Sequence, residues 1–269
     1  MIRLDAVSVF RSGKAILEGV DLGLLAGGVT TILGANGAGK STVVRLLGGE
    51  WRPDRGEVWW SDTPLRRMHR VALARQRAVV SQHVHGAFAL RVLEVVMLGR
   101  LPHRERSEGE NLGIAGAALE QVGLADLADR SIQTLSGGER QRAHLARALA
   151  QLHEARAEGR GLLLLDEPTA HLDLAQQHRF LHLVRALARE GMTVLVVLHD
   201  LHTTAAISDR VALLRRGRLL GLGSPGEVLV PALLEEAYGC AIERYQDSAG
   251  RFFFMPTLES THDNERILE

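Results

Sequence analysis

The stretch that decides the fold is Gly34-Ala35-Asn36-Gly37-Ala38-Gly39-Lys40-Ser41-Thr42, which satisfies the pattern G-x-x-x-x-G-K-[ST]. It follows an apolar run at residues 29–33 and precedes a segment with helical spacing, which is the setting in which this pattern binds phosphate. The glycines let backbone N–H groups surround phosphate oxygens, and the following helix directs its positive end at the same anion. The stretch therefore predicts a phosphate-binding loop, and an ordinary glycine-rich turn is the alternative.

Two side chains of this loop have predicted chemical roles. Lys40 would reach the β- and γ-phosphates of a nucleotide, and the hydroxyl of Ser41 would hold Mg²⁺. ATP and Mg²⁺ are therefore the predicted ligands. The rest of the predicted cradle consists of Gly34, Asn36, Gly37, Ala38, Gly39 and Thr42.

A second pattern supplies carboxylates. Four leucines at 162–165 predict a buried strand, which Pro168 stops directly after Asp166 and Glu167. Asp166 would orient Mg²⁺ and its water, and Glu167 would polarise the attacking water as a general base. The alternative is that the two acids only cap the end of a strand.

The rest of the chain alternates between strand and helix patterns, which predicts a mostly parallel sheet covered on both faces. Residues 83 to about 134 lose the strand pattern and indicate a helical insert, and the last twenty or so residues are polar enough to form a loose tail. Strands are expected within 2–33 and at 57–60, 78–80, 162–165 and 192–198, and helices at 64–77, 90–98, 113–122, from Ser136, at 173–189 and after Asp200.

Composition excludes several classes of protein. The 32 basic residues balance the 32 acidic residues, so the chain lacks the positive field of a non-specific nucleic-acid binder. Cys240 is the single cysteine, which rules out an internal disulfide. The apolar runs are far shorter than the roughly 20 residues of a membrane-spanning helix, and the first residues do not form a signal segment. We therefore expect any membrane role to depend on a partner.

The segment Leu135-Ser136-Gly137-Gly138-Glu139 begins a helical stretch. Ser136 and Glu139 fit a capping box, which would explain both residues locally. Each of two glycines in a first helical turn lowers the stability of the helix by about 1 kcal/mol relative to alanine. A phosphate that approaches the start of the helix would be a sufficient reason for them.

With these motifs in this order the chain resembles the nucleotide-binding subunit of an ATP-binding cassette (ABC) transporter. The resemblance implies an α/β P-loop cassette with a mostly parallel core sheet, an antiparallel N-terminal β subdomain and an inserted α-helical subdomain. The implied division is a core of residues 1–82 and 135–245, a helical subdomain of residues 83–134 and a C-terminal extension of residues 246–269.

The same resemblance implies roles for further residues. Gln82 would contact the γ-phosphate and Mg²⁺, His199 would bond the γ-phosphate, and Asp173 would contact a second subunit. Phe10 would stack on adenine, with a core phenylalanine as the alternative. Two positions depart from the pattern of the family: Gly28 replaces an acid, and His171 stands where a small residue is common.

In this family the signature residues Ser136, Gly137 and Gly138 of one subunit close over the ATP of the other. The implied partners are a second copy of the chain, two transmembrane permease subunits and, indirectly, a periplasmic haem-binding protein, at the cytoplasmic face of the inner membrane. The segments at 77–83 and 98–103 resemble importers of haem, iron-siderophores and cobalamin, most of all the hemin group, as does the long stretch from Gln151 to Gly161. The alternatives are a siderophore or cobalamin importer, or a soluble ATPase of iron–sulfur cluster assembly.

Three histidines of the insert, His83, His85 and His103, could suggest haem ligation, but we expect surface residues that face the partner. The basic residues Arg66, Arg67, His69 and Arg70 are expected to form a solvated helix face, with lipid headgroups or a loop of the partner as the alternative.

Overall fold

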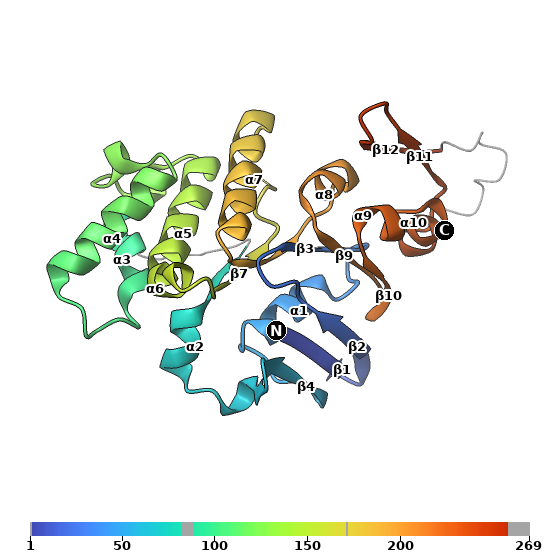
Figure 1. Cartoon of the computed structure of the whole chain (residues 1–269), viewed down its shortest axis with the longest axis horizontal. Helices are drawn as coiled ribbons and strands as arrows, with labels where there is room; N and C mark the ends of the chain where they lie inside the picture. Colours follow the sequence, from blue (N-terminus) through green and yellow to red (C-terminus); the bar gives the residue numbers. More distant parts are fainter. Residues whose placement is uncertain (1, 82–88, 171, 258–269) are drawn as a thin grey trace.

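Two sheets form the body of the computed structural model, which describes residues 2–81, 89–170 and 172–257 (Figure 1). The first is antiparallel, with strand order β2-β1-β4-β5. Its strands are β1 (Ile2–Arg11), β2 (Lys14–Gly23), β4 (Arg55–Trp60) and β5 (Thr63–Pro64). The predicted antiparallel N-terminal sheet is confirmed.

The second sheet has the order β10-β9-β3-β8-β7-β6, and every pair in it is parallel except β9 with β10. Its strands are β3 (Val29–Leu33), β6 (Arg77–Val80), β7 (Leu162–Asp166), β8 (Thr193–Val197), β9 (Arg210–Arg215) and β10 (Arg218–Gly223). This confirms the predicted mostly parallel core sheet. Because β3, β8 and β7 are parallel neighbours, the loops that follow them meet at one edge of the sheet.

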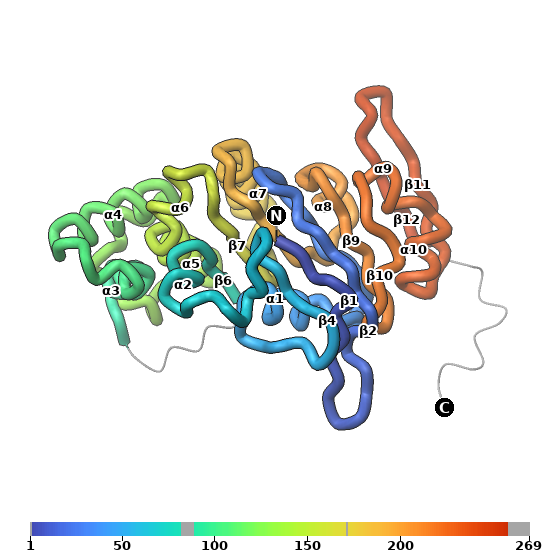
Figure 2. The backbone as a smooth tube through the Cα atoms, turned by 60° about the horizontal axis from the view of Figure 1, so that its bottom comes forward, coloured from blue at the N-terminus to red at the C-terminus, as the bar shows by residue number. Residues whose placement is uncertain are grey.

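Helices cover the sheets and extend the molecule at both ends. Both views place α3, α4, α5 and α6 at one end of the molecule (Figures 1 and 2). At the other end lie α9, α10 and the hairpin of β11 (Ile242–Gln246) and β12 (Phe252–Pro256). The helices are α1 (Lys40–Leu47), α2 (Arg70–Gln76), α3 (Val92–Met97), α4 (Glu108–Gln121), α5 (Gly137–Gln151), α6 (His153–Ala157), α7 (Leu174–Arg189), α8 (Leu201–Ile207), α9 (Pro225–Val228) and α10 (Pro231–Tyr238). None of the helices within the described ranges combines the length and apolar character needed to cross a membrane.

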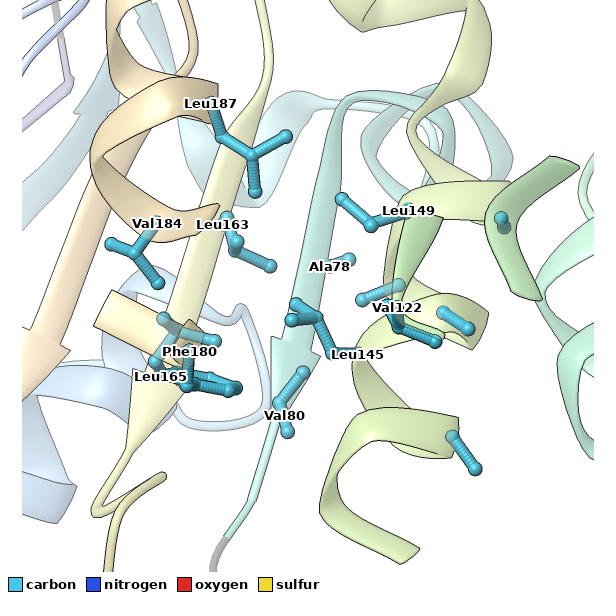
Figure 3. Close-up of a cluster of buried hydrophobic side chains, with 14 of the residues drawn as sticks. Ala78, Val80, Val122, Leu145, Leu149, Leu163, Leu165, Phe180, Val184 and Leu187 are labelled. Atoms are coloured by element: carbon cyan, nitrogen blue, oxygen red, sulfur yellow. The ribbon is translucent and has the colours of Figure 1, made fainter. Parts of the chain in front are cut away.

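The strand β7 lies between β8 and the edge strand β6 and is buried on both faces, which explains its unbroken run of leucines. Leu163 and Leu165 face Phe180, Val184 and Leu187 of α7 (Figure 3). The alternate residues Leu162 and Leu164 belong to a second cluster, with apolar residues of α1 and of the antiparallel sheet. The two clusters fix the carboxyl end of β7, where Asp166 lies, between α1 and α7.

The helix predicted at residues 64–77 is shorter than expected. Pro64 pairs with Trp59 in the antiparallel sheet, and Met68 and His69 have extended backbones, so α2 begins only at Arg70. Pro64 forms a strand pair with β4 and does not start an α-helix, although the spacing of apolar residues favours one. In this arrangement Leu65 is buried. In the basic stretch that precedes α2, Arg66 donates to Glu57 at 2.6 Å.

The C-terminal extension predicted at residues 246–269 contains a strand. β12 (Phe252–Pro256) pairs antiparallel with β11 (Ile242–Gln246), and Phe254 is buried. The expectation of a loose tail is therefore wrong for β12, whose residues are apolar. The polar residues that suggested a loose tail lie nearer the C-terminus. Residues 258–269 lie outside the described part of the chain, and the predicted subdomain boundaries remain predictions.

A buried ion pair joins the helical insert to α6. The side chain of Arg100 is 2% exposed, and its two terminal nitrogens donate to the carboxylate of Glu154 at 2.6 and 3.0 Å. His103 lies beside this pair, with Nε2 2.9 Å from the carbonyl of Gln151 and Nδ1 3.3 Å from Glu154. The expectation that His103 is a surface residue is wrong, and both of its ring nitrogens already have partners.

The pKa of Glu154 predicts how this ion pair depends on pH. Burial raises the pKa, but hydrogen bonds and the charges of His103 and Arg100 outweigh burial and lower it from 4.5 to about 2. The ion pair therefore stabilises the fold above pH 4.5, and this stability is lost as the pH falls from there through about 2.

We expect Glu154→Gln to lower the free energy of unfolding by about 3 kcal/mol at pH 7, because it leaves Arg100 buried without a carboxylate. Urea unfolding at several pH values should show that the difference from wild type shrinks below pH 4.5. The control is Glu105→Gln, which removes the exposed partner of Arg75 and should cost less than about 1 kcal/mol. An equal cost for the two variants at every pH would contradict this assignment.

Candidate functional site

The predicted phosphate loop connects β3 to α1, and two of its glycines are required by the fold. Gly34 has φ +145°, and a Cβ there would lie 2.2 Å from the carbonyl oxygen of Leu214. Gly39 has φ +104° at the N-cap of α1, and its Cβ would lie 2.6 Å from Leu17. These two positions hold the loop against β2 and β9 and leave no room for a side chain.

Lys40 turns back into this loop. Its Nζ donates to the carbonyl oxygens of Gly34 at 2.8 Å and Ala35 at 3.1 Å, and the residue is 6% exposed. Burial lowers the pKa of Lys40, while the charges of Glu167 and Asp166 act in the opposite direction. The loop thus holds a desolvated cation among backbone groups, which is an environment that suits a phosphate.

Ser41 and Asp166 come together from α1 and β7. The Ser41 hydroxyl donates to Oδ1 of Asp166 at 3.3 Å. Burial raises the pKa of Asp166, the hydrogen bond from Ser41 lowers it, and Glu167 raises it further. A hydroxyl and a carboxylate are hard oxygen donors of the kind that Mg²⁺ prefers, and a nearby cation would favour the charged form of Asp166.

The described residues contain no group of three or more histidine, cysteine or acidic side chains that could hold a metal ion. Mg²⁺ usually keeps several waters and binds one or two protein ligands together with substrate phosphates. The pair Ser41–Asp166 therefore fits Mg²⁺ that arrives with a nucleotide.

Glu167 and His199 meet at the carboxyl ends of the neighbouring strands β7 and β8. Nε2 of His199 lies 2.6 Å from Oε1 of Glu167. Glu167 has φ +51°, a left-handed conformation that is costly for a residue other than glycine. The backbone is thus strained at the predicted general base. The imidazole of His199 holds the Glu167 carboxylate in place.

The signature segment begins α5 as the capping box predicts. Ser136 Oγ accepts from the N–H of Glu139 at 3.3 Å, and the Glu139 carboxylate accepts from the N–H of Ser136 at 2.8 Å. Gly138 is buried, and a Cβ there would lie 2.1 Å from Oε1 of Gln176 on α7, so a larger residue would displace the end of this flexible side chain. Gly137, the residue before it, is exposed.

The signature and the phosphate loop do not contact each other through polar groups in one chain. Within the described ranges, no hydrogen bond or ion pair joins residues 34–42 to residues 135–139. A single chain thus brings together the loop, the two acids and His199, and it leaves the signature apart from them.

Asp173, predicted to contact a second subunit, and Phe10, predicted to stack on adenine, are both accessible to solvent. Asp173 is exposed and caps α7 by accepting from the N–H of Gln176 at 2.8 Å. Phe10 is half-buried at the end of β1, and the guanidinium of Arg55 lies 5.5 Å from its ring centre. Phe10 belongs to none of the buried clusters, which disfavours the alternative of a core phenylalanine.

Four residues with a predicted role or a notable position, one glutamine and three histidines, fall in the gaps between the described ranges. Gln82, His83, His85 and His171 lie outside the described residues. The predicted role of Gln82 at the end of β6 remains a prediction.

The phosphate loop, the buried lysine and the strand-end acids define an α/β P-loop nucleotide-binding protein. The chain belongs to the ABC transporter family: a family profile described as ABC transporter matches residues 17–170. It is therefore an ATP-binding protein of this family.

Its relatives share most of its length. The hemin import ATP-binding protein HmuV of Gloeobacter violaceus is 46% identical over 240 residues, which is 89% of this chain and 87% of that protein. The protein of the same name from Deinococcus radiodurans is 44% identical over 238 residues, which covers 88% of this chain and 90% of that one.

Two solved structures share the fold. A transporter in an inward-facing conformation, assigned to the metal-chelate type, is similar at a TM-score of 0.80 and 28% identity, covering 96% of this chain and 98% of that chain. A dimeric bacterial ABC transporter cassette is similar at a TM-score of 0.73 and 28% identity, covering 84% of this chain and 99% of that chain.

Proposed function

We propose that two copies of this chain hydrolyse ATP at shared sites and thereby drive the import of haem through two permease subunits. The observation that carries ATP hydrolysis is the convergence of Lys40, the Ser41–Asp166 pair and the Glu167–His199 pair at one sheet edge. The cargo is supported by the names of the relatives from two organisms, both hemin import proteins.

In this proposal each side chain has one task at the nucleotide. Lys40 exchanges its two carbonyl partners for oxygens of the β- and γ-phosphates. Ser41 and Asp166 would hold Mg²⁺, with Gln82 as the predicted additional ligand, and the ion would supply positive charge to neutralise the phosphates. Phe10 stacks on the adenine ring next to Arg55.

Glu167 acts as the general base and accepts a proton from the attacking water. The contact with His199 at 2.6 Å orients the carboxylate before the nucleotide arrives. Once the nucleotide is bound, an N–H of His199 turns to the γ-phosphate and donates a hydrogen bond to it. Asp166 pairs with Ser41 and Glu167 pairs with His199, so that the two acids serve different atoms.

The second copy of the chain completes the site. Ser136, Gly137 and Gly138 lie at the start of α5, and Ser136 and Gly137 are exposed. The start of this 15-residue helix favours an anion such as the γ-phosphate. Asp173 contacts the same partner in a two-fold, isologous interface. The similarity to a dimeric cassette supports this arrangement.

The proposed location is the cytoplasmic face of the inner membrane, where the chain is held by permease subunits. ATP binding closes the dimer, hydrolysis opens it, and the helical insert transmits the motion to the permease. A periplasmic haem-binding protein delivers the cargo on the other side.

A reconstitution experiment tests the cargo. The chain is assembled with its permease in liposomes, and ATP hydrolysis is measured with the binding protein empty or loaded with haem, an iron-siderophore or cobalamin. We expect haem-loaded protein to stimulate hydrolysis severalfold above the empty protein. Stimulation by only one of the other two ligands would replace haem by that cargo, and failure to assemble with any permease would favour a soluble ATPase.

A further inference from the structure

Two histidines on α7 form a pair that the proposed ATPase mechanism does not use. His178 and His182 are four residues apart and exposed, with ring centres 4.3 Å apart and their Nε2 atoms separated by 3.0 Å. They line a groove of about 530 Å³ between α7 and α8, together with Leu181 and Ile207. We propose that His178 and His182 bind a divalent transition metal ion of the Cu²⁺ or Ni²⁺ kind.

The two nitrogens lie close enough together to bind one ion. Imidazole nitrogens bind such ions at about 2.0–2.1 Å, and two nitrogens that already lie 3.0 Å apart can both approach one ion to that distance. Two imidazoles on one helix face can fill adjacent positions of a square-planar or octahedral complex, which Cu²⁺ and Ni²⁺ adopt.

The pair can present two lone pairs to one ion without moving the helix. As the rings stand, one Nε2–H donates to the other Nε2. When the ion binds, that proton passes through solvent to Nδ1 of the same ring, so both Nε2 atoms become ligands and the total number of protons is unchanged. Residues i and i+4 share one face of a helix, which is why successive turns of α7 place the two rings side by side.

His202, the third histidine of the groove, is already engaged. Its Nε2 accepts from the N–H of Phe254 at 3.1 Å, and its Nδ1 lies 3.5 Å from Asp200. The described residues offer no group of three ligating side chains, so water fills the remaining positions of the ion. The site is therefore open and exchangeable rather than a closed structural centre.

Arginines on α7 set the charge around the ion. Arg185 donates to Asp209 at 2.8 Å and to the carbonyl of Ile207 at 2.9 Å, which balances its charge and ties it to the end of α8 and the segment beyond it. Arg189 also lines the groove and is exposed. We therefore expect solvent anions to complete the coordination of the ion.

The test is a titration of the full chain, without an affinity tag, with Cu²⁺ followed by calorimetry and by pulsed electron paramagnetic resonance. We expect an ion with two equatorial imidazole nitrogens. His178→Gln and His182→Gln should each weaken that binding at least about tenfold and leave a single imidazole. The control His153→Gln removes an exposed histidine of α6 and should change neither result.

Either of two outcomes would overturn the proposal: unchanged Cu²⁺ affinity in both single variants, or a two-imidazole signal that survives in His178→Gln/His182→Gln. Circular dichroism of each variant checks that the fold is intact. The titration contains no nucleotide and no permease, so its result is independent of the proposed ATPase function.

Discussion

Replacing Glu167 with glutamine is expected to lower ATP turnover by about 10²–10⁴-fold while ATP binding is preserved. The amide cannot accept the proton of the attacking water, but Lys40 and the Ser41–Asp166 pair remain in place. A nucleotide-bound dimer should therefore accumulate. Turnover is measured by phosphate release, and the dimer by size-exclusion chromatography in the presence of ATP.

The control for this variant is Glu190→Gln, which changes an exposed acid at the end of α7 that pairs with Arg156. It should leave turnover within about twofold, because a surface ion pair contributes little. Undiminished turnover in Glu167→Gln would remove Glu167 from the role of general base. Loss of ATP binding would instead indicate that the carboxylate organises the loop.

Ser136→Arg should abolish turnover and leave the ATP affinity of the monomer nearly unchanged. Ser136 begins α5, and no hydrogen bond or ion pair between described residues links this segment to the phosphate loop of the same chain. A large cation at the start of α5 obstructs the surface that closes over the ATP of the partner and repels the positive end of the helix dipole. Equilibrium binding of a fluorescent ATP analogue and phosphate release separate the two effects.

Ser107→Arg is a matched control, because Ser107 caps α4 with the same capping box. Both variants lose an N-cap, which costs about 1 kcal/mol, but only Ser136→Arg should stop hydrolysis. Equal losses of turnover would show that the cap, and not the interface, is what matters.

Mixing two inactive variants tests the sharing of sites directly. Lys40→Ala lacks a functional loop and Ser136→Arg lacks a functional signature, so each is expected to be inactive alone. A dimer with one copy of each contains one site in which both halves are intact. Recovered turnover on mixing supports a shared site, whereas the absence of recovery in dimers that form normally would contradict it.

The sequence was sufficient to predict those structural features that depend on residues close together in the chain. The order of strand, glycine loop and helix at residues 29–47 was predictable because the glycines, the lysine and the apolar run act within one supersecondary unit. Capping by Ser136 was predictable for the same reason, since its partner Glu139 is three residues away. The buried strand β7 follows from four consecutive leucines.

Other features depended on residues that are distant in the chain. The helix predicted from residue 64 begins only at Arg70, because Pro64 pairs with β4. His103 is buried by Gln151 and Glu154, about 50 residues away, and nothing in its own neighbourhood predicts this. Long-range packing of this kind overrides local preference, which is worth only tenths of a kcal/mol per residue.

The sequence by itself determined the class of the protein and the residues that surround the phosphates, because the phosphate loop and the strand-end acids are contiguous motifs. Only the tertiary structure decided that Glu167 lies 2.6 Å from His199 and that Gly138 packs against Gln176. These contacts arise where β7, β8, α5 and α7 meet, and parallel strands and packed helices bring together residues that no local pattern connects.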